Sequence, residues 1–154
     1  MKIIFLDIDG PMIPATMFLI ERDCSFERKF PPTTIAVLNE ICKRTEAKIV
    51  FNTTHNTPFD GVPDIEVALV NQGLNKDYLH PTDLKTQYPQ YPRDLAVKVW
   101  LRRHPEVTDW IALDDVRFTE EPNLIWVDPD AGLHTGHLQS AIEKLGGKPF
   151  LILM

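Results

Sequence analysis

Short apolar runs alternate with longer segments of helical periodicity along this chain of 154 residues. The runs are apolar on both sides, so both faces of each must be covered, as in the parallel strands of α/β proteins. The predicted strands are Lys2–Leu6, Lys48–Phe51, Trp110–Leu113, Leu124–Val127 and Phe150–Leu153. The predicted helices are Thr34–Arg44, Asp64–Gln72, Arg93–His104 and Thr135–Leu145. This order predicts an α/β fold with a mostly parallel central sheet between helices.

The first predicted strand runs directly into Asp7 and Asp9, which are followed by Gly10. Residues two apart in an extended segment project to the same side, so both carboxylates face one cavity if the strand ends near Leu6. Open α/β sheets bind their ligands at this carboxyl end of the strands. Aspartate and glycine are also ordinary turn residues, so the motif alone leaves a structural turn and a functional site both open.

Two further predicted strands end in polar residues. Lys48–Phe51 runs into small polar side chains from Asn52 to Asn56, which can donate hydrogen bonds to a phosphate oxygen, and Trp110–Leu113 runs into Asp114 and Asp115. Each cluster alone is also typical of a turn. Together with the first motif they bring four carboxylates and several hydroxyl groups to one end of the sheet. Such an oxygen-rich pocket suits a hard cation such as Mg²⁺, which keeps water or phosphate oxygens as its other ligands.

The composition is that of an ordinary globular protein, with 44% hydrophobic and 25% charged residues. The net charge of −6 gives no basic footprint for general nucleic-acid binding. No apolar stretch is long enough to cross a membrane, and no charged leader precedes an apolar signal core. We therefore expect one cytoplasmic domain over residues 1–154, with no membrane partner. The oligomeric state is left open.

The motifs FLDIDG, KIVFNTT and WIALDD, with a basic helix before the last, resemble those of the haloacid dehalogenase (HAD) superfamily of aspartate-nucleophile phosphatases. The segment LIWVDPDAGLHTGHLQSAIEKL is similar to the end of small domains of this type, so the resemblance spans roughly Met1 to Leu145. Some of these small domains form a group associated with RNA-repair proteins. The resemblance implies a Rossmann-like three-layer sandwich and a Mg²⁺-dependent phosphatase.

The resemblance also implies roles for single residues. Asp7 would be the nucleophile and a metal ligand, while Asp9 would be the general acid and base and bind the metal through its backbone carbonyl. Thr53 would hold the phosphoryl group, with Thr54 beside it as a further phosphate-binding residue. The metal site would be completed by Asp114, and by Asp115 either as a direct ligand or as the residue that orients metal-bound water. A general acid two residues after the nucleophile favours phosphatase chemistry over dehalogenation.

The family also has a Lys or Arg that neutralises the nucleophile and the phosphate. A residue in the first turn of a helix that follows a strand faces the site, and one a turn and a half later is displaced by about 7 Å. Arg93 fits the first-turn position best. Lys98 lies deeper in the same predicted helix, and Lys85 reaches the site only if the preceding loop folds inward. We predict Arg93, with Lys98 and Lys85 as alternatives.

Two features bear on the substrate. After Thr54 the chain carries His55 and Asn56, where some similar small domains carry a Trp-Arg pair, so this chain has no arginine there to contact a phosphate. His55 is either a substrate-binding residue or a histidine packed in a loop. Residues 11–30 are long enough for a small hairpin flap but not for a large cap domain. An open site would admit a small phosphate ester or the phosphorylated end of a macromolecule.

Three functions are consistent with these residues. The first is a magnesium-dependent phosphomonoester hydrolase that forms an aspartyl phosphate, and the second is a narrower nucleotide or polynucleotide-end phosphatase. The third is a non-catalytic phosphate-binding or interaction domain on the same scaffold. Because every acid of the motifs is present, we expect an active enzyme.

Overall fold

The computed structural model describes residues 1–19, 29–120 and 122–149. Its sheet has four parallel strands in the order β2-β1-β3-β4. The strands are β1 (Lys2–Leu6), β2 (Lys48–Phe51), β3 (Asp109–Asp114) and β4 (Leu124–Trp126). The predicted α/β fold with a parallel sheet is confirmed. The last predicted strand, Phe150–Leu153, lies outside the described residues.

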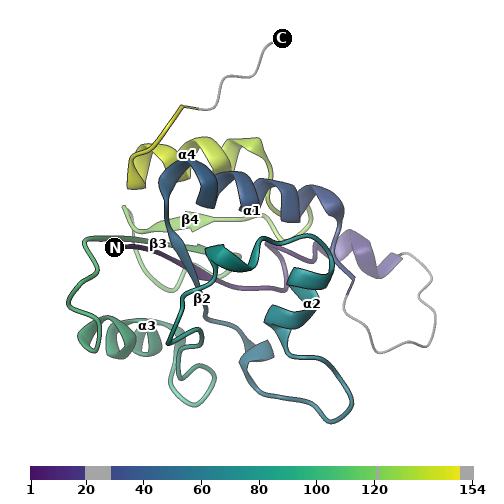
Figure 1. Ribbon diagram of the computed structural model, residues 1–154. Helices are drawn as coiled ribbons and strands as arrows, with labels where there is room; N and C mark the ends of the chain where they lie inside the picture. The colour runs from purple at the N-terminus through teal and green to yellow at the C-terminus, as the bar shows by residue number, and fades with distance from the viewer. Residues whose placement is uncertain (20–28, 121, 150–154) are drawn as a thin grey trace.

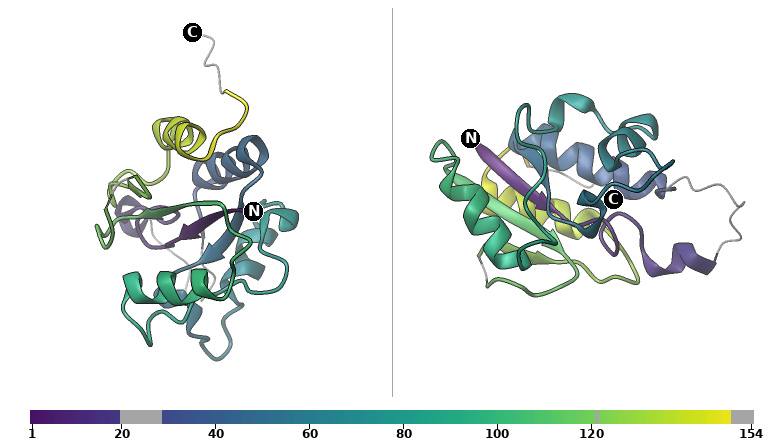
Figure 2. Two further views of the ribbon diagram at one scale, coloured as in Figure 1. Left: turned by 90° about the vertical axis from the view of Figure 1, so that its left-hand side faces the viewer. Right: turned by 90° about the horizontal axis from the view of Figure 1, so that it is seen from below.

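Helices cover both faces of this sheet, which gives the predicted three layers (Figure 1). α1 (Pro32–Thr45) and α4 (Thr135–Leu145) lie side by side on one face, and α3 (Arg93–Arg102) lies on the other. The left view in Figure 2 shows the sheet between these layers from a second side. α2 (Ile65–Asn71) packs into the same apolar cluster as α1 and α4. Three short 3₁₀ helices complete the described elements: η1 (Ala15–Leu19), η2 (Thr54–Asn56) and η3 (Lys76–Tyr78).

Side chains of each strand alternate between two apolar clusters, one on each face of the sheet. In β1, Ile4 and Leu6 face α1 and α4, whereas Ile3 and Phe5 face α3. Phe5 lies edge-on to the fully buried Trp100 of α3, with ring centroids 5.4 Å apart. Because the alternation has a period of two, the first residue after β1 is directed to the same side as Phe5, towards α3.

The described residues contain no large cap domain, as the sequence predicts. Residues 11–30, the predicted flap, include the 3₁₀ helix η1 directly after an isolated bridge between Asp9 and Ile13. A hairpin over the whole flap stays a prediction, because residues 20–28 lie outside the described part of the chain. Among the described residues, no helix has the length and apolar character needed to span a membrane.

Candidate active site

The register of the central strands places three polar residues in a row at the carboxyl end of the sheet. Leu6 of β1 is level with Phe51 of β2 and with Leu113 of β3. Leu6 is followed by Asp7, Phe51 by Asn52 and Leu113 by Asp114. Each of these three polar residues is at most 4% exposed. Backbone hydrogen bonds extend the ladder into this row, from the Asp7 amide to the Leu113 carbonyl at 3.1 Å and from the Asn52 amide to the Leu6 carbonyl at 2.9 Å. The predicted convergence of these strand ends is therefore observed.

Three carboxylates cluster at this position. Asp7, Asp114 and Asp115 each have a carboxylate oxygen within 4.8 Å of one from each of the others. Oδ1 of Asp115 is buried, and no other described residue gives it a hydrogen bond. Hard oxygen donors of this kind suit Mg²⁺, so the cluster fits a magnesium site. The side chain of Asp9 is not in the cluster, and its backbone carbonyl as a metal ligand stays a prediction.

Arg93 is the basic residue that reaches these carboxylates. It is the first residue of α3, and its Nη1 lies 3.2 Å from Oδ2 of Asp7 and 2.9 Å from Oδ2 of Asp114. The other two candidates lie elsewhere: Lys98 is exposed, and Nζ of Lys85 pairs with Glu66 at 3.3 Å. Arg93, the first-turn residue predicted from the sequence, therefore lies beside the predicted nucleophile.

Even with Arg93 present, the acidic cluster has an excess of negative charge. Burial, together with repulsion from Asp114, raises the pKa of Asp7 to about 8, although the charge of Arg93 acts in the opposite direction. Burial also raises the pKa of Asp114 to about 6. Carboxyl groups whose pKa values are raised in this way by burial and by neighbouring charges are typical of functional sites.

In the absence of a divalent cation, we expect the free energy of unfolding to fall as the pH rises from 5 to 8. Asp7 has a pKa of about 8 in the folded chain and of 3.8 in the unfolded chain. Between these two values the folded chain holds a proton on Asp7 that the unfolded chain has released, so raising the pH favours unfolding. Adding Mg²⁺ should restore stability at pH 8 if the cation binds only the folded chain. Urea unfolding at both pH values, with EDTA or with Mg²⁺, measures this. An Asp7→Asn variant with an unchanged pH dependence would contradict the assignment.

Hydrogen-bond donors from the turn after β2 lie beside the cluster. Thr53 is fully buried, and its Oγ1 accepts a hydrogen bond from the His55 amide at 3.3 Å, so its hydroxyl hydrogen can be donated to a phosphate. Oδ1 of Asn52 accepts from the Thr86 hydroxyl at 2.7 Å, and its buried Nδ2 has no partner among the described residues. Thr54, the second predicted phosphate-binding residue, is exposed on η2.

Asp9 meets a residue whose role the sequence left open. Its Oδ2 lies 3.1 Å from Nε2 of His55, and its side chain is 57% exposed whereas that of His55 is 17% exposed. Sequence reasoning missed a further residue, Tyr88, whose ring centroid lies 4.6 Å from the guanidinium carbon of Arg93. Tyr88 precedes α3 in a loop without periodicity, so no sequence signal pointed to it.

Gly10 allows the loop after β1 to lie directly against the loop after β3. Its φ of +100° is in the region that favours glycine, and a Cβ atom there would lie 3.0 Å from both Cβ and Cγ of Asp115. The glycine of the first motif is thus required both by its backbone conformation and by its close contact with the acidic cluster.

Comparison with known families agrees with this geometry. Residues 3–138 match the family described as the HAD domain in Swiss Army Knife RNA repair proteins. No curated protein and no solved structure matches the chain. The matched segment contains the acidic cluster, Arg93 and the turn after β2, and HAD domains are typical of phosphatase-type hydrolases that use Mg²⁺. The chain belongs to the family of HAD domains of Swiss Army Knife RNA repair proteins.

Proposed function

We propose that the chain is a magnesium-dependent phosphomonoester hydrolase in which Asp7 is the nucleophile. The observation that carries the proposal is the buried row at the carboxyl end of the sheet, where Asp7 lies next to Asp114 and within 3.2 Å of Arg93. A buried carboxylate next to a second acid needs a functional reason, because its ionisation is unfavourable. Membership of the HAD family supports phosphoryl transfer as that reason.

The residues present fit a magnesium ion. Asp7, Asp114 and Asp115 would hold it through their side chains, and Asp9 through its backbone carbonyl. Oδ1 of Asp115, buried and without a partner among the described residues, is one donor that such an ion would use. When bound, the ion supplies positive charge that screens the repulsion between a carboxylate nucleophile and an anionic phosphate.

The side chains then divide the reaction into two steps. In the first, a carboxylate oxygen of Asp7 attacks phosphorus, the ester P–O bond breaks, and Asp9 gives its proton to the departing oxygen. In the second, Asp9 takes a proton from water, the water oxygen attacks phosphorus, and Asp7 is released with orthophosphate. Arg93 and the Thr53 hydroxyl would stabilise the charge on the phosphoryl oxygens.

The test uses the full chain with a panel of phosphomonoesters. We expect phosphate release with Mg²⁺, a fall to background with EDTA, and recovery when Mg²⁺ is added back. Beryllofluoride, which mimics a phosphoryl group on a carboxylate, should bind and raise Tm in the presence of Mg²⁺. A chain that binds beryllofluoride but hydrolyses none of the esters would favour a non-catalytic phosphate-binding domain. A chain that does neither would contradict the proposal.

A narrower candidate is a phosphatase that acts on the end of a polynucleotide. The description of the family, which names RNA repair proteins, favours it, and so does the lack of a large cap in the described residues. With a net charge of −6, the chain would recognise the phosphorylated end and not a long stretch of backbone. This candidate requires kcat/KM for 5′- or 3′-phosphorylated oligonucleotides to exceed that for sugar phosphates, and equal turnover of both would count against it.

A further inference from the structure

The turn after β2 brings His55 against Asp9, 46 residues earlier in the chain. Nε2 of His55 lies 3.1 Å from Oδ2 of Asp9, which is within hydrogen-bond distance. The Asp9 side chain is 57% exposed, and an exposed aspartate in water samples several rotamers. A hydrogen bond between Asp9 and the less exposed His55 ring therefore selects one orientation of the Asp9 carboxyl group.

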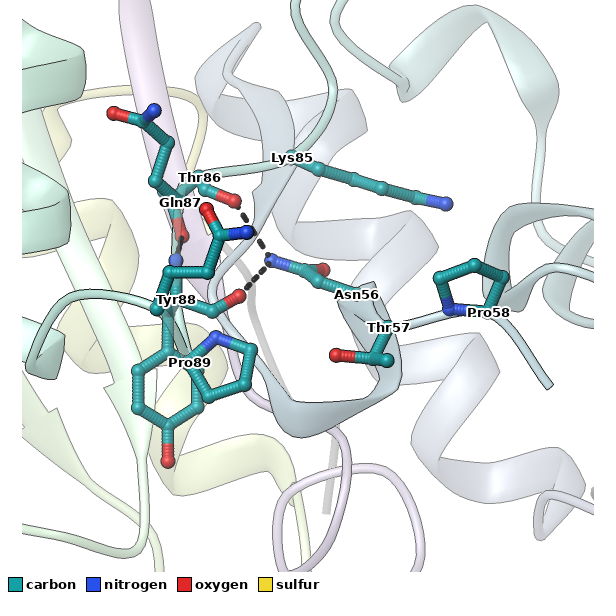
Figure 3. A pocket seen from close by; sticks show the side chains of 9 residues that line it. Asn56, Thr57, Pro58, Lys85, Thr86, Gln87, Tyr88 and Pro89 are labelled. Atoms are coloured by element: carbon teal, nitrogen blue, oxygen red, sulfur yellow. Dashed lines mark hydrogen bonds between the residues drawn. The ribbon is translucent and has the colours of Figure 1, made fainter.

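The turn that carries His55 is itself held in place. The His55 amide donates to Oγ1 of Thr53 at 3.3 Å, and the Asn56 amide donates to the Thr53 carbonyl at 3.0 Å. Figure 3 shows the Asn56 side chain reaching across to the segment before α3. Its Nδ2 lies 3.0 Å from the carbonyl oxygen of Phe51, 3.2 Å from that of Thr86 and 3.3 Å from that of Tyr88. His55 thus projects from an anchored support, as an orienting residue must.

We propose that His55 is the positioning residue for the general acid, holding Asp9 so that its acidic proton lies on Oδ1 and is directed to the leaving oxygen. The inference rests on the proposed phosphatase function. In the tautomer that this role requires, Nε2 carries a proton and donates it to Oδ2, and the acidic proton of Asp9 lies on the other oxygen, Oδ1. A ring with a proton on Nε2 supplies the donor that this arrangement needs.

The consequence concerns the first step of the reaction. As the bond from Asp7 to phosphorus forms and the ester P–O bond breaks, the Oδ1 proton of Asp9 passes to the ester oxygen, which leaves as an alcohol. A primary alcohol is a poor leaving group and needs that proton. p-Nitrophenolate is stable as an anion and leaves without it. Loss of His55 should therefore slow the hydrolysis of alkyl phosphates far more than that of p-nitrophenyl phosphate.

The experiment compares His55→Ala with His55→Gln on these two substrates. His55→Ala should lower kcat/KM about 30-fold for a primary alkyl phosphate and about threefold or less for p-nitrophenyl phosphate, since general acid catalysis is worth about 10²–10⁴. His55→Gln keeps an N–H donor at a similar reach and should recover most of the loss. Thr57→Ala, an exposed residue one position after η2, is the matched control and should behave as wild type on both substrates.

A double mutant separates positioning from a general structural effect. In an Asp9→Asn background, His55→Ala should cause no further loss on the alkyl phosphate, because the group that it positions is already gone. Equal losses on both substrates, or an additive loss in the double mutant, would overturn the role of His55 but leave the phosphatase function standing. A wild-type chain that hydrolyses neither ester would overturn the phosphatase function, and this role with it.

Discussion

Replacing Asp7 with Asn is expected to abolish phosphate release while leaving the fold intact. The variant lacks the oxygen nucleophile, so kcat should fall by at least about a thousandfold on every phosphoester. The side chain is only 5% exposed, and its pKa is raised to about 8, mainly by burial. A neutral amide of the same size removes the repulsion with Asp114, so Tm at pH 8 should be unchanged or higher.

Steady-state phosphate release and thermal unfolding measure the two halves of this prediction on one preparation. Asp94→Asn is the matched control, because Asp94 is an exposed carboxylate on the first turn of α3 and lies next to Arg93 in sequence. It should keep wild-type turnover. If Asp7→Asn retains more than a few per cent of the activity, the nucleophile is another group.

Replacing Arg93 with Met is expected to impair both catalysis and stability. The guanidinium lies within 3.2 Å of the Asp7 and Asp114 carboxylates, so its loss leaves two buried acids without this counter-charge. We expect kcat/KM to fall about 100-fold, since one preorganised charged contact is worth about that much. At pH 8 without Mg²⁺, the free energy of unfolding should fall by about 3 kcal/mol, as when one partner of a buried ion pair is removed.

The loss of stability should shrink as the pH falls. Asp7 and Asp114, with pKa values of about 8 and about 6, are largely protonated in the folded chain at pH 5, and a neutral acid needs no counter-charge. Lys98→Met, an exposed lysine on the same helix, is the matched control and should change neither quantity. Arg93→Lys should be intermediate, because it restores the charge without the planar fork. Equal stability of Arg93→Met and Lys98→Met at pH 8 would show that Arg93 does not compensate the buried acids.

The parts of the site that the sequence predicts are those attached to regular elements. Asp7 directly follows β1 and Asp114 is the last residue of β3, so the register of these parallel strands brings them together whatever the loops do. Arg93 follows from helix geometry, since a first-turn residue faces the carboxyl end of the sheet. Several strand and helix ends shift by one or two residues, whereas the bounds of β1, β2 and α4 are as predicted. For example, α3 ends at Arg102 and not at the predicted His104, whose amide instead bonds to the Leu101 carbonyl in a tightened last turn.

The parts that the sequence does not predict depend on loop conformation. His55 meets Asp9 because a 3₁₀ turn directs its ring back over the site, and Tyr88 meets Arg93 because the segment before α3 is held by Asn56. These contacts join residues from different loops, and no periodicity in either loop encodes them. Asn56 is an example, because its side-chain amide donates to three backbone carbonyls. Every residue has a backbone carbonyl, so the sequence does not show which of them Asn56 contacts.

The contact between Gly10 and Asp115 has a consequence for how this domain can vary in evolution. Any side chain at position 10 would push against the Asp115 side chain, at 3.0 Å from its Cβ and Cγ atoms. The distance between the loop that carries Asp7 and the loop that carries Asp115 is therefore set by the main chain at Gly10. No change of side-chain rotamer at that position can adjust it. A related chain that has exchanged this glycine must have displaced an acid of the cluster. The residue at position 10 thus distinguishes related chains that keep the acidic cluster from those that keep only the fold.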